Sequence, residues 1–160
     1  MMLIVYRTLD QGKSMATRYR LSLWRRLLNH LVRALLRVGL GPRRTYLLTV
    51  QGCQTGRPYS TPVTLVEEEG QRWLVAPYGV VGWVRKARPA GRAMLRRGRR
   101  TEAGAMVEFG PADSAPVLKR DLTEVPITRP FFHASPDAPL DAFQAEAARH
   151  PVFHMVGPDA

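Results

Sequence analysis

The chain has 160 residues, of which 45% are hydrophobic and 23% charged; this is enough for one domain with a hydrophobic core, and it excludes a disordered chain. There is no run of eighteen apolar residues and no secretory signal, so neither a membrane span nor export is predicted. The single cysteine, Cys53, excludes an intrachain disulfide and fits the reducing cytoplasm, where we expect the protein.

Charge is unevenly distributed along the sequence. The net charge is +11 at pH 7, with +16 in residues 1–100 and −5 in residues 101–160. Nearly all the cations are arginine, whose planar guanidinium pairs well with phosphate and carboxylate groups. The amino-terminal part therefore favours an anionic partner, such as nucleic acid, a lipid surface or an anionic cofactor. A general compositional bias toward arginine is the plain alternative.

The first predicted element is an amphipathic helix over residues 22–38, with Ser22 as N-cap and Gly39 after its end. Its polar residues recur at three- and four-residue intervals on one face. We expect this helix to pack on the rest of the fold or at a subunit interface, and peripheral binding to the inner face of an anionic membrane is the alternative. Residues 1–21 are predicted to be a flexible extension, because Met15 offers a second start.

After this helix the sequence is rich in strand-forming residues separated by short turns. Strands are predicted at Thr45–Gln51, Ser60–Glu67, Gln71–Pro77, Ala90–Arg97, Arg100–Phe109 and Pro151–Val156, and short helices at Pro111–Glu124 and Pro139–His150. Strands that follow one another with few intervening helices indicate an antiparallel barrel rather than a doubly wound parallel sheet. The predicted fold class is mainly β (α+β), in a single domain over residues 22–160.

No familiar catalytic set occurs in the sequence, which lacks a nucleophile elbow, a zinc-protease motif, a P-loop and a Rossmann glycine pattern. His150 and His154 are four residues apart, but they flank a predicted helix–strand junction, so no metal site is predicted. Cys53 has no identifiable histidine partner and is interpreted as an ordinary loop cysteine.

The first candidate site is the glycine-bearing segment Gly52–Pro62. Its two glycines permit backbone angles that expose successive N–H groups, and Thr55 and Arg57 add a hydroxyl and a guanidinium. This combination suits an anion, most simply a phosphate. An ordinary hairpin turn explains these residues equally well when they are taken alone.

The second candidate site is the segment Ala76–Arg88, in which a strand ends in a loop containing Gly79 and passes into a short helical turn. That turn carries Trp83 and three cations beginning at Arg85. A planar aromatic cofactor can lie on the loop while a cation meets its acidic tail. The alternative is a packed tryptophan beside a solvated basic face.

Three patterns occur in order along the chain. They are Gly-x-x-Thr-Gly-Arg-Pro-x-x-Thr-Pro at Gly52–Pro62, Tyr-Gly-x-x-Gly-Trp-Val-Arg at Tyr78–Arg85, and the ending Arg149–Phe153. Together they resemble the deazaflavin-dependent nitroreductase family over most of the chain. The resemblance implies a six-stranded split β-barrel, often a homodimer, that binds reduced coenzyme F-420. It also implies an oxidoreductase that passes hydride to a small-molecule acceptor, namely a quinone, a nitroaromatic compound or a similar molecule.

The resemblance also implies which residues contact the cofactor. These are Gln54, Thr55, Gly56, Arg57, Pro62, Val63, Thr64, Ala76, Pro77, Tyr78, Gly79, Trp83, Arg85 and Lys86. On the acceptor side the candidates are Tyr78, Phe132 and His133, with Phe131 beside them. Packing in the core is the alternative role of these aromatic residues.

Two sites depart from the family pattern. Cys53 and Gln54 stand where the family has a basic pair, and Lys86 stands where asparagine is expected. Because the loss of two cations weakens a phosphate site, FMN is the alternative cofactor. Our hypothesis is that Arg43–Arg44 and Arg57 compensate for the missing pair.

Two other classes of function are weighed against the enzyme. One is a non-catalytic carrier of flavin or another ligand on the same barrel. The other is a basic nucleic-acid-binding protein that uses Arg96–Arg100. Nucleic acid is the disfavoured partner, because this cluster is expected at a hairpin tip without aromatic residues for base stacking. Hydride transfer needs no catalytic triad, since the cofactor performs the difficult step.

Overall fold

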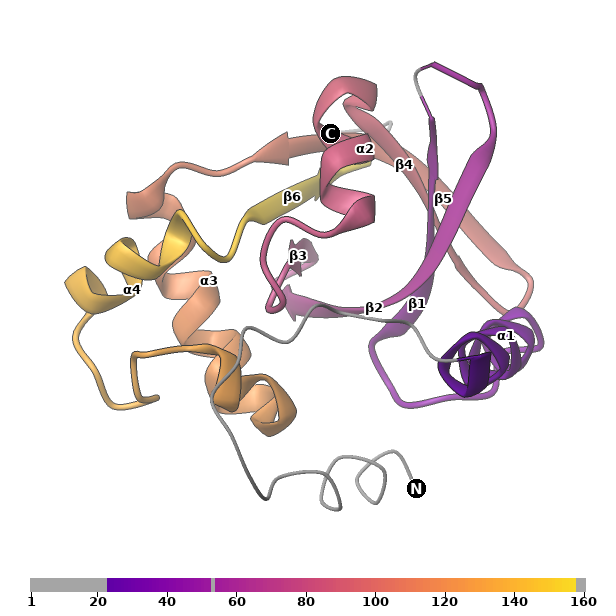
Figure 1. Cartoon of the computed structure of the whole chain (residues 1–160). Coiled ribbons are helices and arrows are strands. Elements are labelled where there is room, and N and C mark those ends of the chain that lie inside the picture. The colour runs from indigo at the N-terminus through magenta and orange to yellow at the C-terminus, as the bar shows by residue number, and fades with distance from the viewer. Residues whose placement is uncertain (1–22, 53, 158–160) are drawn as a thin grey trace.

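The computed structural model describes residues 23–52 and 54–157. The predicted extension at residues 1–21, the N-cap Ser22 and the loop residue Cys53 lie outside the described residues. Expectations about those positions therefore stay predictions. The described part of the chain forms a β-barrel with helices around it (Figure 1).

Within the described residues, six strands form a closed barrel in the order β1-β2-β3-β6-β5-β4 (Figure 1). They are β1 (Thr45–Gln51), β2 (Pro58–Glu68), β3 (Gln71–Val75), β4 (Arg92–Arg97), β5 (Arg100–Glu108) and β6 (Val152–Val156). Every neighbouring pair is antiparallel. The last strand returns from the carboxyl-terminal part of the chain to close the barrel between β3 and β5. These observations confirm the predicted mainly β fold.

Apolar side chains from all six strands fill the barrel interior. The fully or almost fully buried members include Leu48, Val50, Leu65, Leu74, Leu95 and Phe153. Helix α2 (Gly82–Ala90) adds Trp83, Val84 and Ala87 to the same cluster. Burying each large side chain stabilises the fold by about 1.5–3 kcal/mol before the entropy cost of ordering it. The core therefore anchors α2, and with it the loop that precedes this helix.

Two carboxyl-terminal helices lie beside the barrel (Figure 1). A second apolar cluster packs between these helices and the barrel. Helices α3 (Pro111–Glu124) and α4 (Leu140–Ala147) contribute Leu118, Leu122 and Phe143 to it. Val75 joins this outer cluster, whereas its neighbour Leu74 faces the barrel interior. β3 is therefore apolar on both faces because it is covered on both sides, as the sequence predicts for covered strands.

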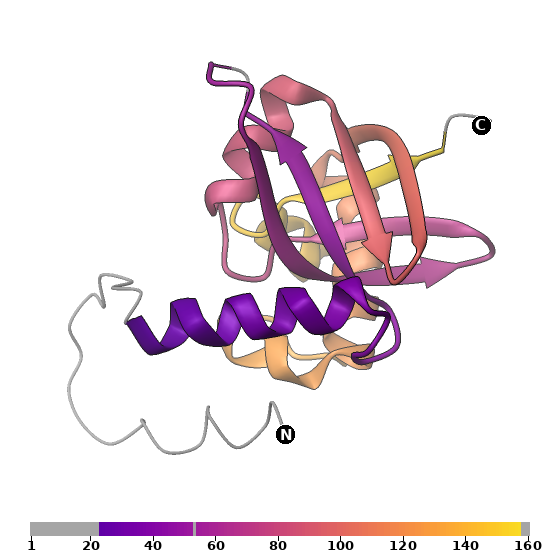
Figure 2. The same ribbon diagram turned by 90° about the vertical axis from the view of Figure 1, so that its right-hand side faces the viewer.

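Helix α1 (Leu23–Arg37) confirms the predicted amino-terminal helix and lies across one end of the barrel, as Figure 2 shows. Its end is joined to the β4–β5 turn, where the Gly98 N–H donates to the Leu36 carbonyl at 2.9 Å. Gly98 has φ +59, and a Cβ there would lie 3.2 Å from the Cα of Gly39. This close approach explains a glycine at each of the two positions.

Two elements differ from the sequence prediction. α2 is a helix of nine residues rather than a short turn, and it ends at Gly91, whose N–H donates to the Ala87 carbonyl at 2.8 Å. A 3₁₀ helix, η1 (Pro126–Phe131), occupies a stretch for which no element was predicted. Prolines inside both elements read as breakers, which is why a local interpretation misses them.

Candidate functional site

The first glycine segment forms the exposed turn between β1 and β2. The Gly56 N–H donates to the Gly52 carbonyl at 2.8 Å, and the Gly52 N–H donates to the Arg57 carbonyl at 3.1 Å. Gly56 has φ +63, which favours glycine. The Thr55 hydroxyl accepts a hydrogen bond from the Arg57 N–H at 3.4 Å. This turn leaves the Arg57 side chain and Gln54 exposed.

The second glycine segment turns the chain from β3 into α2. The Ala76 N–H donates to the Pro151 carbonyl at 2.9 Å, and the Gly79 N–H donates back to the Ala76 carbonyl at 3.0 Å. Gly79 has φ +80, and a Cβ on it would lie 3.3 Å from the carbonyl oxygen of Arg149. Only a glycine fits this position comfortably, so the loop lies tight against the end of α4.

Tyr59 brings the two glycine segments together. A Cβ built on Gly82, at the start of α2, would lie 3.3 Å from the Tyr59 hydroxyl. The Lys86 Nζ lies 4.5 Å from the centre of the Tyr59 ring, a cation–π geometry. Gly56 itself remains exposed at the hairpin tip, with nothing within 4 Å of a built Cβ. The two segments therefore meet where Tyr59 approaches Gly82 and Lys86. A cofactor-binding groove between the segments stays a prediction.

The remaining predicted cofactor residues fall into two groups. Val63, Ala76 and Trp83 are buried in the barrel core, where Trp83 packs 5.5 Å from Phe153 between ring centres. The half-buried group comprises Pro62 and Thr64, both on β2, and Pro77 in the loop after β3. The buried residues support the walls of the site.

Three cations at the two segments have no ion-pair partner within the described part of the chain: Arg57, Arg85 and Lys86. By contrast, Arg88 on the same helix binds Glu108 through two hydrogen bonds of 2.9 and 2.8 Å. Arginines that already have a carboxylate partner are committed to the fold. Unpaired cations remain available to an anionic ligand.

The compensation hypothesis is wrong for Arg43 and Arg44. They precede β1, whereas the glycine turn follows the other end of this strand. The Arg44 guanidinium also forms an ion pair with Glu124 of α3. A seven-residue strand separates its two ends by roughly 20 Å, so neither arginine replaces the missing basic pair. Only Arg57 of this set lies at the turn.

An open pocket of about 480 Å³ lies where the second glycine segment meets the carboxyl-terminal helices. We call it the acceptor pocket; it is lined by Pro77, Tyr78, Gly79, Val80, Phe131, His133, Ala148, Arg149 and His150. The Tyr78 and Phe131 rings meet edge to face at 4.7 Å. Tyr78 and His133, both predicted for the acceptor side, therefore border one cavity although they lie far apart in the sequence.

Phe132, the third acceptor-side candidate, lies behind the pocket wall. It is buried and stacks on the His150 ring, with 3.9 Å between the ring centres. Its exposed neighbour Phe131 lines the pocket instead. Arg149 and His150 line the pocket but were not predicted as site residues. The sequence signal for them was the family-like ending Arg149–Phe153, which was not read as part of a site.

A buried carboxylate and imidazole lie under the acceptor pocket. The Glu146 Oε2 is 3.3 Å from the His150 Nε2, and both side chains are almost completely buried. Burial lowers the pKa of His150 below its ordinary value, although Glu146 and the backbone of Ala76 and Pro77 act in the opposite direction. The imidazole is therefore neutral at pH 7, beside a carboxylate.

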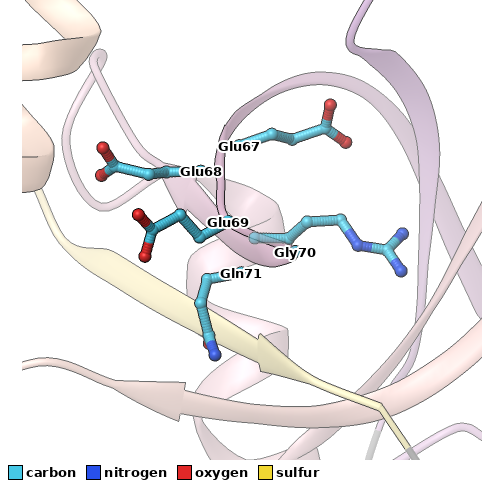
Figure 3. A pocket seen from close by; sticks show the side chains of 6 residues that line it. Glu67, Glu68, Glu69, Gly70 and Gln71 are labelled. Carbon is cyan, nitrogen blue, oxygen red and sulfur yellow. The ribbon is translucent and has the colours of Figure 1, made fainter.

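A second hollow, of about 360 Å³, lies at the β2–β3 turn and is lined by Glu67–Arg72. Figure 3 shows Glu67 pointing away from Glu68 and Glu69. Glu68 pairs with Arg120, and Glu67 accepts a hydrogen bond from the Tyr46 hydroxyl at 3.1 Å. These diverging and partnered carboxylates do not form a site.

The described residues contain neither a metal-binding cluster nor a membrane-spanning helix. Among the residues that the structure describes, no three His, Cys, Asp or Glu side chains come close enough to hold a metal ion. No described helix has both the length and the apolar character needed to cross a bilayer.

Comparison with known proteins decides the family. The family model for F420H(2)-dependent quinone reductase matches residues 24–122, more than half of the chain. The chain belongs to this family. Membership places it among the F-420-dependent oxidoreductases as a class, and it confirms the resemblance found in the sequence. The match covers both glycine segments and ends before the second wall of the acceptor pocket.

Solved structures share the fold at low sequence identity. A structure of an F420-H2-dependent reductase, FDR-A, is 20% identical with TM-score 0.52, covering 71% of this chain and 94% of that one. A chain described as a domain-swapped dimer is 18% identical with TM-score 0.56, covering 82% and 96%. A protein of unknown function from Agrobacterium tumefaciens is 15% identical with TM-score 0.55, and the match covers 80% of this chain but only 54% of that one. No curated protein matches the sequence significantly.

Proposed function

We propose that this F420H(2)-dependent reductase family member transfers a hydride from reduced coenzyme F-420 to a planar conjugated acceptor, namely a quinone, a nitroaromatic compound or a similar molecule. The observation that carries the proposal is the acceptor pocket, which joins Tyr78 and His133 beside the second glycine segment. The pocket is open, partly aromatic and next to the predicted cofactor loop. This is the arrangement that a two-substrate hydride transfer requires.

The residues of the two glycine segments fit an anionic cofactor. Arg57, Arg85 and Lys86 have no ion-pair partner within the described residues, and all three belong to these segments. Their charge suits the phosphodiester and carboxylates of the coenzyme tail. The bound coenzyme supplies the hydride. The protein holds its tail with these cations and fixes the neighbouring loop through Gly79.

The acceptor pocket has the features that bind and orient a flat acceptor. Tyr78 and Phe131 present aromatic surface for an offset or edge-to-face contact with a ring. The Arg149 side chain is 56% exposed at the rim, and its Nε lies 4.0 Å from the Glu146 Oε2, a distance longer than a hydrogen bond. A cation placed there stabilises the negative charge that develops on the acceptor's oxygens during reduction.

Titration of coenzyme F-420 into the protein, followed by tryptophan fluorescence, tests the cofactor assignment. Trp83 packs behind the loop, so we expect quenching that is lost in Trp83→Phe. Arg85→Ser removes an unpaired cation and is expected to weaken binding about tenfold. Arg88→Ser on the same helix is the matched control, because Arg88 is already paired with Glu108 and its loss is expected to change affinity less than about twofold. Equal effects of the two substitutions would contradict the assignment.

Measuring turnover of reduced F-420 distinguishes the proposed enzyme from a non-catalytic carrier. Oxidation of the reduced coenzyme by a water-soluble naphthoquinone or a nitrobenzene derivative supports the proposal. Tight binding of F-420 without turnover on either acceptor would favour the carrier. Preferential binding of FMN would instead show that the absence of the basic pair, now Gln54 and Cys53, changed the cofactor.

We also propose a cytoplasmic homodimer as the assembly. Its support is the family resemblance and the related fold described as a domain-swapped dimer. Light scattering coupled to size-exclusion chromatography measures the mass directly. A species of twice the 18.0 kDa chain mass is expected, and a concentration-independent monomer would contradict it.

A second proposed partner is an anionic membrane surface. Leu31 and Leu35 of α1 are 56% and 40% exposed on one side of the helix, and Val38 and Leu40, just beyond its end, are 69% and 60% exposed. The arginine-rich β4–β5 turn, Arg96–Arg100, adjoins the end of this helix through the hydrogen bond between Gly98 and Leu36. Apolar side chains beside clustered cations suit an anionic lipid surface.

Flotation with phosphatidylcholine vesicles, with or without phosphatidylglycerol, tests this partner. Binding only to the anionic vesicles is expected, and the double substitution Leu35→Ser and Val38→Ser is expected to weaken it about tenfold. Leu140→Ser is the matched control, since Leu140 is an exposed leucine elsewhere on the molecule. Equal flotation of all three proteins would contradict the membrane surface.

A further inference from the structure

One buried carboxylate holds the second wall of the acceptor pocket. Glu146 of α4 is 2% exposed, and its Oε1 accepts hydrogen bonds from the backbone N–H groups of His133 at 2.8 Å and Ala134 at 3.1 Å. These N–H groups follow η1, where the chain has no helical or strand partner for them. Glu146 therefore sets the position of the segment that carries Phe131 and His133.

The other oxygen of the same carboxylate faces the first wall. The Glu146 Oε2 lies 3.3 Å from the His150 Nε2, and the His150 ring in turn adjoins the backbone of Ala76 and Pro77. Phe132 covers the other side of this ring, with 3.9 Å between the ring centres. Two side chains thus lie packed between the loop Ala76–Gly79 and the segment after η1, and the His150 ring nitrogens make no hydrogen bond within the described residues.

We propose that Glu146 and His150 form a positioning pair that fixes how the loop carrying Tyr78 meets the segment carrying Phe131 and His133, and so the shape of the acceptor pocket. The inference rests on the proposed function of this pocket. We treat both as positioning residues: Glu146 is buried and does not line the pocket, and His150 is 5% exposed, at the pocket's base. They act on the acceptor through the backbone that they hold.

The free energy lost when the Glu146 carboxylate is buried favours a positioning role for this residue over a role in core stability alone. A buried carboxylate loses its hydration, and apolar residues of similar size often replace a buried polar pair with no loss of stability. Glu146 makes its hydrogen bonds to a segment outside its own helix, and every segment it reaches borders the pocket. Glu146 therefore holds in place a segment that borders the pocket.

Three substitutions test the pair in the full chain. Glu146→Leu removes both acceptor oxygens, Glu146→Gln keeps one oxygen for the two N–H groups, and His150→Asn removes the ring but keeps a polar side chain. In Glu146→Leu, amide exchange at His133 and Ala134 is expected to become at least about tenfold faster in the protein without cofactor or acceptor. Glu146→Gln is expected to restore most of the protection.

Kinetics with a naphthoquinone gives the second readout. Glu146→Leu and His150→Asn are expected to raise KM for the quinone about tenfold, with kcat changed less than about threefold and F-420 affinity unchanged. Glu146→Gln is expected to rescue KM. If Glu146→Leu does not fold, amide exchange and KM for the quinone are measured on His150→Asn instead.

Unchanged amide exchange and unchanged KM in a folded, active variant would overturn the positioning pair alone. A loss of F-420 affinity equal to the rise in KM would also overturn it, because the pair would then serve the cofactor. A wild-type protein that reduces no quinone or nitro compound would instead overturn the proposed function, while the exchange data would still report whether Glu146 holds the segment.

Discussion

Gly79 and Gly56 both have positive φ, but their surroundings differ. A Cβ on Gly79 would press against the Arg149 carbonyl at 3.3 Å, whereas a Cβ on Gly56 would meet nothing within 4 Å. Gly56→Ala therefore carries only the left-handed backbone strain, about 1 kcal/mol, and Gly79→Ala is expected to cost about 2–3 kcal/mol. Urea unfolding of the two variants measures the difference, and equal losses would contradict the tight loop.

Asp121 of α3 is a second residue whose environment makes a prediction. It is 3% exposed, and burial raises its pKa from 3.8 to about 6, while the hydrogen bond with the Thr128 hydroxyl at 3.0 Å lowers it and Glu124 raises it further. The folded protein therefore binds this proton more tightly than the unfolded chain. Its contribution is fully present below about pH 4 and is lost as the pH rises through about 6.

This titration is expected to lower the free energy of unfolding by about 3 kcal/mol between pH 4 and pH 7, relative to a variant without the group. Asp121→Asn keeps a partner for Thr128 and removes the titration, so its stability is expected to be flatter over this range and higher at pH 7. Asp137→Asn, at an exposed carboxylate, is the control. The same pH slope in Asp121→Asn and wild type would refute the assignment.

Among the elements, β5 and β6 approach each other closely at Gly104. A Cβ on Gly104 would lie only 2.4 Å from the carbonyl oxygen of Val156, so the two strands must separate to accept a side chain. Gly104→Ala is expected to destabilise the barrel by about 2–3 kcal/mol. Thermal unfolding checks this, with Gly110→Ala as the control because a Cβ there meets no atom within 4 Å. Equal melting temperatures would argue against the close approach.

Most elements were predictable because their signals are local. Strand β1 begins and ends at the predicted residues, Thr45–Gln51, and α3 does the same, Pro111–Glu124. Proline inside α2 and η1 obscured these short helices, whereas α3 was predicted despite its internal Pro116, because Pro111 and Asp113 mark its start.

The site was only partly predictable, for a different physical reason. Tyr78 belongs to a family pattern and His133 was an acceptor-side candidate, whereas Arg149, although part of the family-like ending, was not predicted as a site residue. Arg149 borders the pocket because tertiary folding places the end of α4 against Gly79. A lone glutamate in a helix, such as Glu146, reads as a surface residue from sequence alone. Its burial depends on contacts that no local pattern encodes.

For the whole molecule, the uneven charge of the sequence becomes a set of ion pairs between its two parts. Arg44, Arg72 and Arg88 pair with carboxylates from beyond residue 100. At the two glycine segments, Arg57, Arg85 and Lys86 have no ion-pair partner among the described residues, and we propose that they meet the cofactor tail.

The affinity for F-420 is therefore expected to be salt-dependent and to fall about tenfold between 0.05 and 0.5 M NaCl. Isothermal titration at the two salt concentrations measures this change, with Arg85→Ser expected to show a shallower slope. An affinity independent of salt would show that the cations do not hold the tail.

A crystal structure of the protein with coenzyme F-420 and a quinone analogue tests the central claim most directly. The account predicts the coenzyme's tail beside Arg57, Arg85 and Lys86, its ring beside Gly79, and the quinone against Tyr78 and Phe131 in the acceptor pocket. Density for the coenzyme away from both glycine segments, or for the quinone outside this pocket, would contradict it.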